Sequence, residues 1–431
     1  MSVDQSSAGK LYIKKRTVSE WMMLFIFFFP AAQAFLTELL PIPDAIKFLC
    51  DGFLVLLLLK LFSQRFTKID NYSMPFVVIV GLFFFITLVG YLFNYQSVFY
   101  YLWGLRNNIR MFVAFFAFAY LADWEDAKGW IKALDVLFVI NFAVVILQYF
   151  SGYGQDYIGG IFGTSKGCNG SLLIFLCIVF AKTILSFMRG EEKMSKCIFV
   201  SVASLLVSTL SELKMFFILF ILILFMASFM TAHSIKKTLF FAFGAVLVVL
   251  FGTLLTVLYK DFTDFLSFDS LIKALTDTGY ATDEDIGRFT ALPVISQRFL
   301  PGFFRKLFGL GLGNCDSSSL SMFNTPFFES HQTVHYSYFS YAFLFLETGF
   351  VGLALYASFF VASFFVSRKL KKLEMADEFA CQMSIILSVI SLILLVYNSS
   401  LRMEIGFMLF FVLALPIISA NEQRESDDVY I

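Results

Sequence analysis

Long apolar runs, separated by short polar segments, extend along almost the whole chain. A helix needs about 20 consecutive apolar residues to cross the roughly 30 Å hydrocarbon core of a bilayer. The pattern predicts an all-α polytopic membrane protein with about twelve transmembrane helices. The apolar runs cover residues 21–40, 43–62, 74–93, 101–121, 131–151, 168–188, 196–211, 213–231, 237–258, 335–363, 380–397 and 402–419.

Lysine and arginine residues concentrate in alternate loops, which predicts an orientation. Residues Lys10 to Arg16 are rich in basic side chains and precede the first run. If that end is inside, the other inner loops are basic and the short outer loops are almost free of basic residues, so both termini are expected in the cytoplasm. The tripeptide Ala32-Gln33-Ala34 resembles a signal-peptide cleavage site, but the apolar run continues past it and we expect it to be retained. The inner-loop residues are Arg65, Lys68, Lys128, Arg189, Lys193, Lys196, Lys236, Lys237, Arg368, Lys369, Lys371 and Lys372.

One long polar segment, residues 259–334, falls on the outer side in this topology. Its apolar-basic stretch FLPGFFRKLFGLGLG predicts short amphipathic helices on the membrane surface, followed by a tight turn at the glycines that returns the loop towards the membrane. A loop this long in a compact protein is usually functional. We therefore expect one integral membrane domain, residues 1–431, that contains one long extracytoplasmic loop.

Composition agrees with a membrane protein and excludes several other classes. The chain is 59% hydrophobic and 15% charged, whereas soluble domains carry about a quarter charged residues. The formal net charge is zero, whereas a nucleic-acid-binding protein usually carries an excess of basic residues. The six cysteines show no CxxC spacing, so we expect no metal site and no disulfide framework. We also expect no cofactor.

Two arginines, Arg106 and Arg110, lie within the apolar segment YLWGLRNNIRMFVAFFAFAYL. Four-residue spacing places them on one helix face. A guanidinium stays charged at physiological pH, and inserting one into a bilayer costs about 2.5–3.5 kcal/mol. The face must therefore meet water, a counter-charge or an anionic ligand. Acidic residues at matching depth are scarce in the sequence, which favours the ligand.

Further ionisable residues fall near the outer surface in this topology. Lys47 and Asp51, four residues apart, are expected to pair with each other. Arg402 is a candidate interfacial anchor, with Glu404 as its candidate partner. Together with the basic residues of the long loop, this set is rich in cations. Its other members are Lys166, Glu212, Lys214, Arg288, Arg298, Arg305, His331, His335 and Glu347.

Arginines beneath the outer surface suit a lipid-linked phosphate or diphosphate, whose tail lies in the bilayer and whose head faces outwards. Guanidinium groups match phosphate oxygens bidentately and keep their charge in a low-dielectric groove. Because ATP is absent on that side, the lipid diphosphate would itself be the leaving group, with arginines stabilising the developing charge. A histidine or carboxylate would deprotonate the attacking hydroxyl. No acidic pair with metal-ligand spacing is visible outside, so we expect metal-independent chemistry.

Several segments resemble the O-antigen polymerase and O-antigen ligase superfamily, which includes the Wzy-type polymerases of bacterial surface polysaccharides. GLRNNIRMFVAFFAF is similar to the family's paired-arginine helix, and GGIFGTSKGCNGSLLIF to its Gly-Thr-Phe…Asn stretch, with Cys168-Asn169 where Pro-Asn is usual. LSELKMFFILF resembles the family's Ser-Arg motif, with Lys214 where arginine is usual. In the loop, Gly287-Arg288, FGLGLGN, His335 and ETGFVG follow the family order.

The resemblance implies a metal-independent, inverting glycosyltransferase at the outer face of the bacterial cytoplasmic (inner) membrane. Its substrates would be polyprenyl-diphosphate-linked oligosaccharide repeat units of an O-antigen, capsule or exopolysaccharide. Membrane lipid, a chain-length regulator and a flippase are candidate partners. The implied catalytic residues are His335 and Arg288, with His331 as the substitute for the histidine. The implied substrate-binding residues are Arg106, Arg110, Lys214, Arg298 and Arg402.

Other functions remain open at this stage. An O-antigen ligase, which transfers the finished glycan to the lipid A core, would share the donor chemistry and differ in acceptor. A lipid-linked oligosaccharide flippase would also need many spans and central cations, but it should distribute charge along a cavity reachable from both sides. A small-solute transporter is less favoured, because no pair of discontinuous helices suggests inverted repeats.

Overall fold

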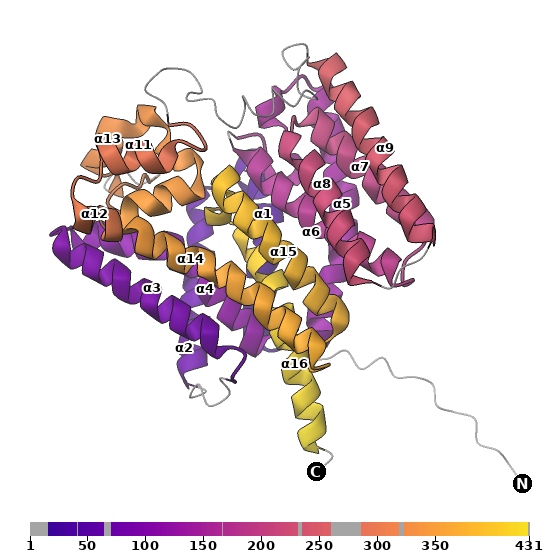
Figure 1. The fold of residues 1–431 in the computed structure, drawn as a ribbon, viewed down its shortest axis with the longest axis horizontal. Helices are drawn as coiled ribbons and strands as arrows, with labels where there is room; N and C mark the ends of the chain where they lie inside the picture. The colour runs from indigo at the N-terminus through magenta and orange to yellow at the C-terminus, as the bar shows by residue number, and fades with distance from the viewer. Residues whose placement is uncertain are drawn as a thin grey trace, which may run out of the picture.

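A computed structural model describes residues 16–40, 42–63, 70–165, 167–231, 235–259, 286–318 and 323–429 (Figure 1). Every regular element in this part of the chain is a helix. Eight of the described helices are long and apolar enough to cross a membrane. The predicted all-α polytopic membrane protein is confirmed at this level.

Each predicted apolar run corresponds to one helix. Three of these helices, α2, α7 and α8, have 17 residues each, about 25 Å, which is shorter than the hydrocarbon core, and α4 contains the paired arginines. The bounds are α1 (Val18–Ala34, continued by a π-helical turn, Phe35–Leu39), α2 (Lys47–Ser63), α3 (Met74–Phe93), α4 (Val98–Leu121), α5 (Trp124–Phe150), α6 (Cys168–Met188), α7 (Met194–Leu210), α8 (Lys214–Met230), α9 (Ile235–Leu258), α14 (Ser340–Lys372), α15 (Glu378–Tyr397) and α16 (Gly406–Val429).

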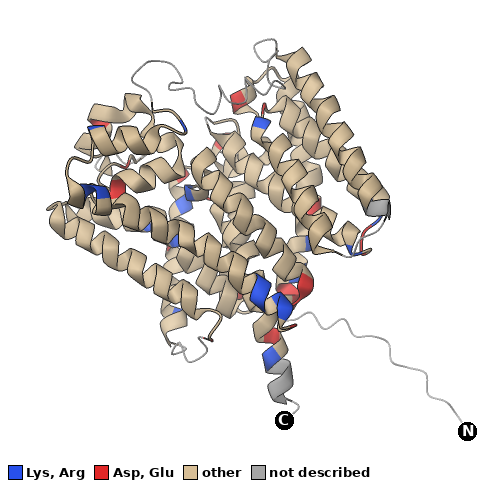
Figure 2. Cartoon of the chain, in the orientation of Figure 1, with Lys and Arg blue, Asp and Glu red and all other residues tan. Residues whose placement is uncertain are grey.

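The bundle has apolar side chains both inside and on its outer surface. Helix α6 is the most deeply buried of the eight candidate spans, with 94% of its apolar window buried, followed by α16 with 83%. The outward faces of other helices expose large apolar residues such as Val139 and Phe229, and Figure 2 shows long stretches of helix without charged residues. An apolar exterior of this kind suits lipid rather than water.

Much of the predicted long loop lies outside the described residues, including 260–285 and 319–322. Its described part forms three short helices, α11 (Ala291–Arg298), α12 (Phe303–Phe308) and α13 (Pro326–His331). They gather at the end of the bundle opposite to the C-terminal end of α16 (Figure 1). The stretch FFRKLF is helical as predicted, with Phe303 and Phe304 exposed.

The glycine-rich segment after α12 is inserted between helices rather than forming a simple turn. Helix α14 is broken at Gly349, where φ is 65° and ψ is −169°. The amides of Leu310 and Gly311 donate to the carbonyls of Leu346 and Glu347 at 2.9 and 3.0 Å, which satisfies backbone groups beside the break. A Cβ on Gly313, where φ is 81°, would collide with the Tyr100 carbonyl. The segment therefore requires glycine for both conformation and space.

Candidate functional site

The paired arginines of α4 each meet a carboxylate. Arg106 donates to Asp51 Oδ2 through Nε and Nη2, at 2.9 and 2.7 Å. Arg110, whose side chain is 7% exposed, donates through Nη1 to Glu404 Oε1 at 2.9 Å. Its Nη2 also donates to the carbonyl of Arg402 at 2.8 Å. Helices α2 and α4 and the segment that leads into α16 are thus joined by two largely buried ion pairs.

A third ion pair joins this cluster to the glycine-rich segment. Arg402 Nη2 lies 3.1 Å from Asp316 Oδ2, and the guanidinium stacks on Phe343 of α14 at 3.4 Å from the ring centre. Asn107 donates to the same carboxylate oxygen at 2.7 Å. Glu347, fully buried, accepts the amide of Cys315 at 3.0 Å. We call Arg106, Arg110, Arg402, Asp51, Asp316 and Glu404 the paired cluster.

The paired cluster corrects three expectations. The prediction that acidic partners are scarce near Arg106 and Arg110 is wrong, because Asp51 and Glu404 lie beside them. Asp51 does not pair with Lys47, whose partner is Asp44. Glu404 pairs with Arg110, so it is not the partner of Arg402, which instead binds Asp316.

Two ionisable groups in the connecting segments, Glu404 and Cys315, have pKa values that differ from their usual ones. Burial opposes the charge on Glu404, but the neighbouring positive charge and the hydrogen bond of Arg110 outweigh it and lower the pKa of this carboxyl. Burial raises the pKa of the Cys315 thiol well above its usual value, which makes that thiol unreactive. All six cysteines are unpaired thiols, and no group of three or more metal-ligating side chains occurs among the described residues.

Arg288 lies on the other side of the first half of α14. The amide of Ile286 donates to the carbonyl of Val334 at 3.2 Å, so the segment carrying Arg288 runs beside the one carrying His335. Tyr341 of α14 donates its hydroxyl to the Arg288 carbonyl. The structure thus brings the predicted Gly-Arg and histidine segments together.

The Arg288 guanidinium is half-buried and lies against aromatic rings. It is centred 4.4 Å from the ring of Tyr397 and 5.3 Å from that of Phe339. Its Nε donates to the Tyr397 carbonyl at the end of α15, at 3.1 Å. The two aromatic rings and this hydrogen bond restrict the positions of the guanidinium.

Lys214, at the start of α8, lies within electrostatic range of Arg288 and of Asp156. It forms an ion pair with Glu212 at 3.0 Å. Helices α6 and α8 both begin without a side-chain cap, and the start of α6 at Gly170 packs against Asn398, directly after Tyr397. Two helix N-termini, whose dipoles favour anions, therefore accompany the basic side chains. We call Arg288, Lys214 and His335 the open group.

The two candidate histidines differ in their surroundings. His335 has a left-handed backbone, with φ at 57°, and its ring lies 4.5 Å from that of Tyr338. His331 hydrogen-bonds the carbonyl of Phe327 in its own helix at 3.1 Å and stacks on that ring. His331 is therefore held within α13, whereas His335 lies beside the Arg288 segment.

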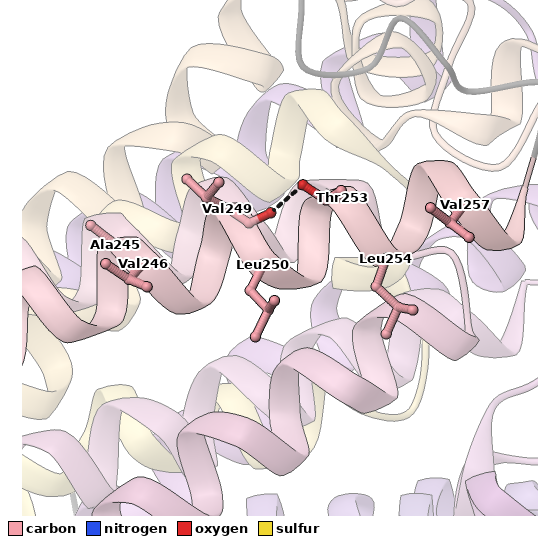
Figure 3. Close-up of a pocket in the computed structure, with 7 residues that line it drawn as sticks. All are labelled: Ala245, Val246, Val249, Leu250, Thr253, Leu254 and Val257. Atoms are coloured by element: carbon pink, nitrogen blue, oxygen red, sulfur yellow. Dashed lines mark hydrogen bonds between the residues drawn. The ribbon is translucent and has the colours of Figure 1, made fainter.

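Two further features lie outside both groups. Arg298 is exposed in the last turn of α11, where a cation complements the helix dipole. A shallow hollow along α9 is lined only by residues of that helix, and its one polar side chain, Thr253, donates to the carbonyl of Val249 (Figure 3). The hollow is apolar and suits lipid contact. Its other lining residues are Ala245, Val246, Leu250, Leu254 and Val257.

Comparison with known proteins adds no family assignment. No family model matches the chain, and no curated protein matches it. The likeness to the O-antigen polymerase and ligase superfamily therefore depends on the motifs quoted above.

Proposed function

We propose that this protein is a polymerase of polyprenyl-diphosphate-linked oligosaccharide repeat units, acting at the outer face of a bacterial cytoplasmic membrane. About twelve spans, with both termini in the cytoplasm, would place the end of the bundle that carries α11–α13 outside. Membrane lipid would surround the apolar exterior, and a chain-length regulator and a flippase would be its pathway partners.

The observation that carries the proposal is the convergence of the open group. Arg288 and His335 lie on adjoining segments, and Lys214, at the uncapped start of α8, lies within electrostatic range of Arg288. A guanidinium, an ammonium group and helix N-termini are features that bind phosphate oxygens. A histidine beside them supplies a group that can accept a proton near neutral pH.

The proposed reaction transfers the growing glycan onto a sugar hydroxyl of a new lipid-linked unit. His335 takes the hydroxyl proton while the oxygen attacks the anomeric carbon, with inversion. The bond between that carbon and the diphosphate oxygen breaks, and the lipid diphosphate leaves with the electron pair. Arg288 and Lys214 stabilise the negative charge that develops on the leaving group. The reaction consumes no nucleotide.

The paired cluster has a supporting role in this proposal. A phosphate could reach Arg106, Arg110 or Arg402 only by displacing a carboxylate that comes from a distant segment of the fold, whereas the carboxylate that Lys214 binds belongs to its own turn. Breaking a buried pair leaves an uncompensated charge and costs about 3–5 kcal/mol. These arginines therefore hold the glycine-rich segment and the start of α16 in place. Arg298 is exposed and is available to a substrate only at the surface.

The test uses purified protein in nanodiscs, incubated with a lipid-linked repeat unit and with neither nucleotide nor added metal. A ladder of polymer lengths is expected on a gel. Unchanged substrate would contradict the proposal, provided that the same substrate preparation is extended by a polymerase of known activity. A single transfer that requires a lipid A core acceptor would identify a ligase instead.

A further inference from the structure

Glutamate occupies a position where glycine is the usual residue. Helix α7 ends at Leu210, and Glu212 follows with φ at 54°. The amide of Leu213 donates to the Ser208 carbonyl at 2.8 Å, and that of Glu212 to the Thr209 carbonyl at 3.3 Å. This is the hydrogen-bond pattern of a Schellman motif, in which the left-handed residue is most often glycine.

The left-handed backbone lets Glu212 reach Lys214. Side chains two residues apart in a regular helix do not face each other. Because the chain leaves α7 at Glu212 and enters α8 at Lys214, the two side chains turn towards one another and the ion pair forms at 3.0 Å. A side-chain hydrogen bond also stabilises the turn, because Ser208 Oγ donates to the Leu213 carbonyl at 2.9 Å.

A lysine needs such a contact more than an arginine would. Its ammonium group is carried on a flexible four-carbon stem and lacks the planar fork of a guanidinium. Lys214 lies within electrostatic range of Arg288, whose positive charge repels it. A carboxylate beside Lys214 offsets that repulsion and limits the positions of the ammonium group.

We propose that Glu212 is a positioning residue, kept at a glycine position because its carboxylate holds Lys214 at the start of α8 for diphosphate binding. The inference rests on the proposed function. It makes an unusual prediction, since the substitution that suits the backbone best should harm binding.

Glu374 provides the matched control. It follows α14 with φ at 55°, and the amides of Glu374 and Met375 donate to Lys371 and Leu370 in the same pattern. Its side chain is exposed. Glycine at either position relieves the left-handed strain, so E212G and E374G should both unfold at the wild-type temperature or above it.

The experiment measures thermal unfolding and the binding of farnesyl diphosphate, with farnesol as the ligand that lacks phosphates. We expect E212G and E212Q to weaken diphosphate binding about tenfold, E212D to recover part of it, and E374G and E374Q to leave it unchanged. E212Q keeps the backbone strain, so it reports on the carboxylate even if E212G misfolds.

The possible outcomes separate the inference from the proposed function. If the wild-type protein binds farnesyl diphosphate no better than farnesol, the diphosphate site fails, and the role of Glu212 fails with it. If the wild type binds selectively but E212G and E212Q bind as well or more tightly, only the positioning role is overturned. Tighter binding is what simple removal of a negative charge would give.

Discussion

The paired cluster and the open group lie on either side of the first half of α14, and they handle positive charge differently. In the paired cluster each arginine meets a carboxylate within 3.1 Å, so the charge is balanced inside the protein. In the open group Arg288 lies against aromatic rings, and Lys214, which is paired with Glu212 at 3.0 Å, lies within its electrostatic range. Ion pairs between distant segments join structural elements, whereas basic side chains at the start of a helix suit an anionic ligand.

The largest effect should come from the histidine of the open group. Changing His335 to Asn keeps a residue that tolerates the left-handed backbone but removes the proton acceptor. Polymer formation should fall about 10²–10⁴-fold, the usual contribution of a general base. The gel assay measures this, with H331N as the control, which should retain most of the activity. If H331N lost activity and H335N retained it, His331 would be the proton acceptor.

The paired cluster should respond in stability rather than in turnover. Changing Glu404 to Gln leaves Arg110 buried without a counter-charge, and the free energy of unfolding should fall by about 3–5 kcal/mol. Unfolding in detergent checks this. The double variant R110M/E404M removes both charges and should recover much of the loss. An unchanged unfolding curve for E404Q would show that the pair is not structural.

A smaller loss of stability is expected where the glycine-rich segment crosses α4. Changing Gly313 to Ala adds a Cβ against the Tyr100 carbonyl at a left-handed φ, and should cost about 2–4 kcal/mol. Gly190 is the matched control, because its φ is 80° but nothing lies within 4 Å of an added Cβ. G190A should therefore lower the free energy of unfolding only through the strain of alanine at a left-handed φ. Equal losses in both variants would mean that close packing of the segment is unimportant.

The smallest effect tests the geometry of the open group. Changing Arg288 to Lys keeps the charge but loses the planar fork and its stacking on Tyr397. Turnover should fall about 10–100-fold with little change in unfolding temperature, which corresponds to about 1.4–2.7 kcal/mol of transition-state stabilisation. R298K is the control and should leave turnover unchanged. Full turnover in R288K would remove Arg288 from the site.

Helix positions were largely predictable because lipid imposes a strong local pattern. Helices α3 and α6 have the bounds 74–93 and 168–188 that the apolar runs predicted. Every backbone group in a bilayer must be satisfied within the segment, so an apolar run of sufficient length becomes a helix. Short runs such as α7 and α8 were also found as helices, although their division depended on a few polar residues.

The partners of the buried arginines could not be predicted in the same way. Asp51, Asp316 and Glu404 lie 55, 86 and 294 residues from the arginines that they bind. No local period in the sequence encodes such distances. The break in α14 was missed for a similar reason, because it depends on the inserted glycine-rich segment. The one sequence signal for these contacts was the acidic residue Asp316, which lies just after the glycine-rich segment.

The central claim is that the diphosphate binds at the open group and not at the paired cluster. The most direct measurement is a cryo-electron microscopy structure of the protein in nanodiscs with a polyprenyl diphosphate bound. Phosphate density beside Arg288 and Lys214, with the three buried ion pairs intact, is the predicted result. Phosphates lying between Arg106 and Arg110, with Asp51 and Glu404 displaced, would contradict the account.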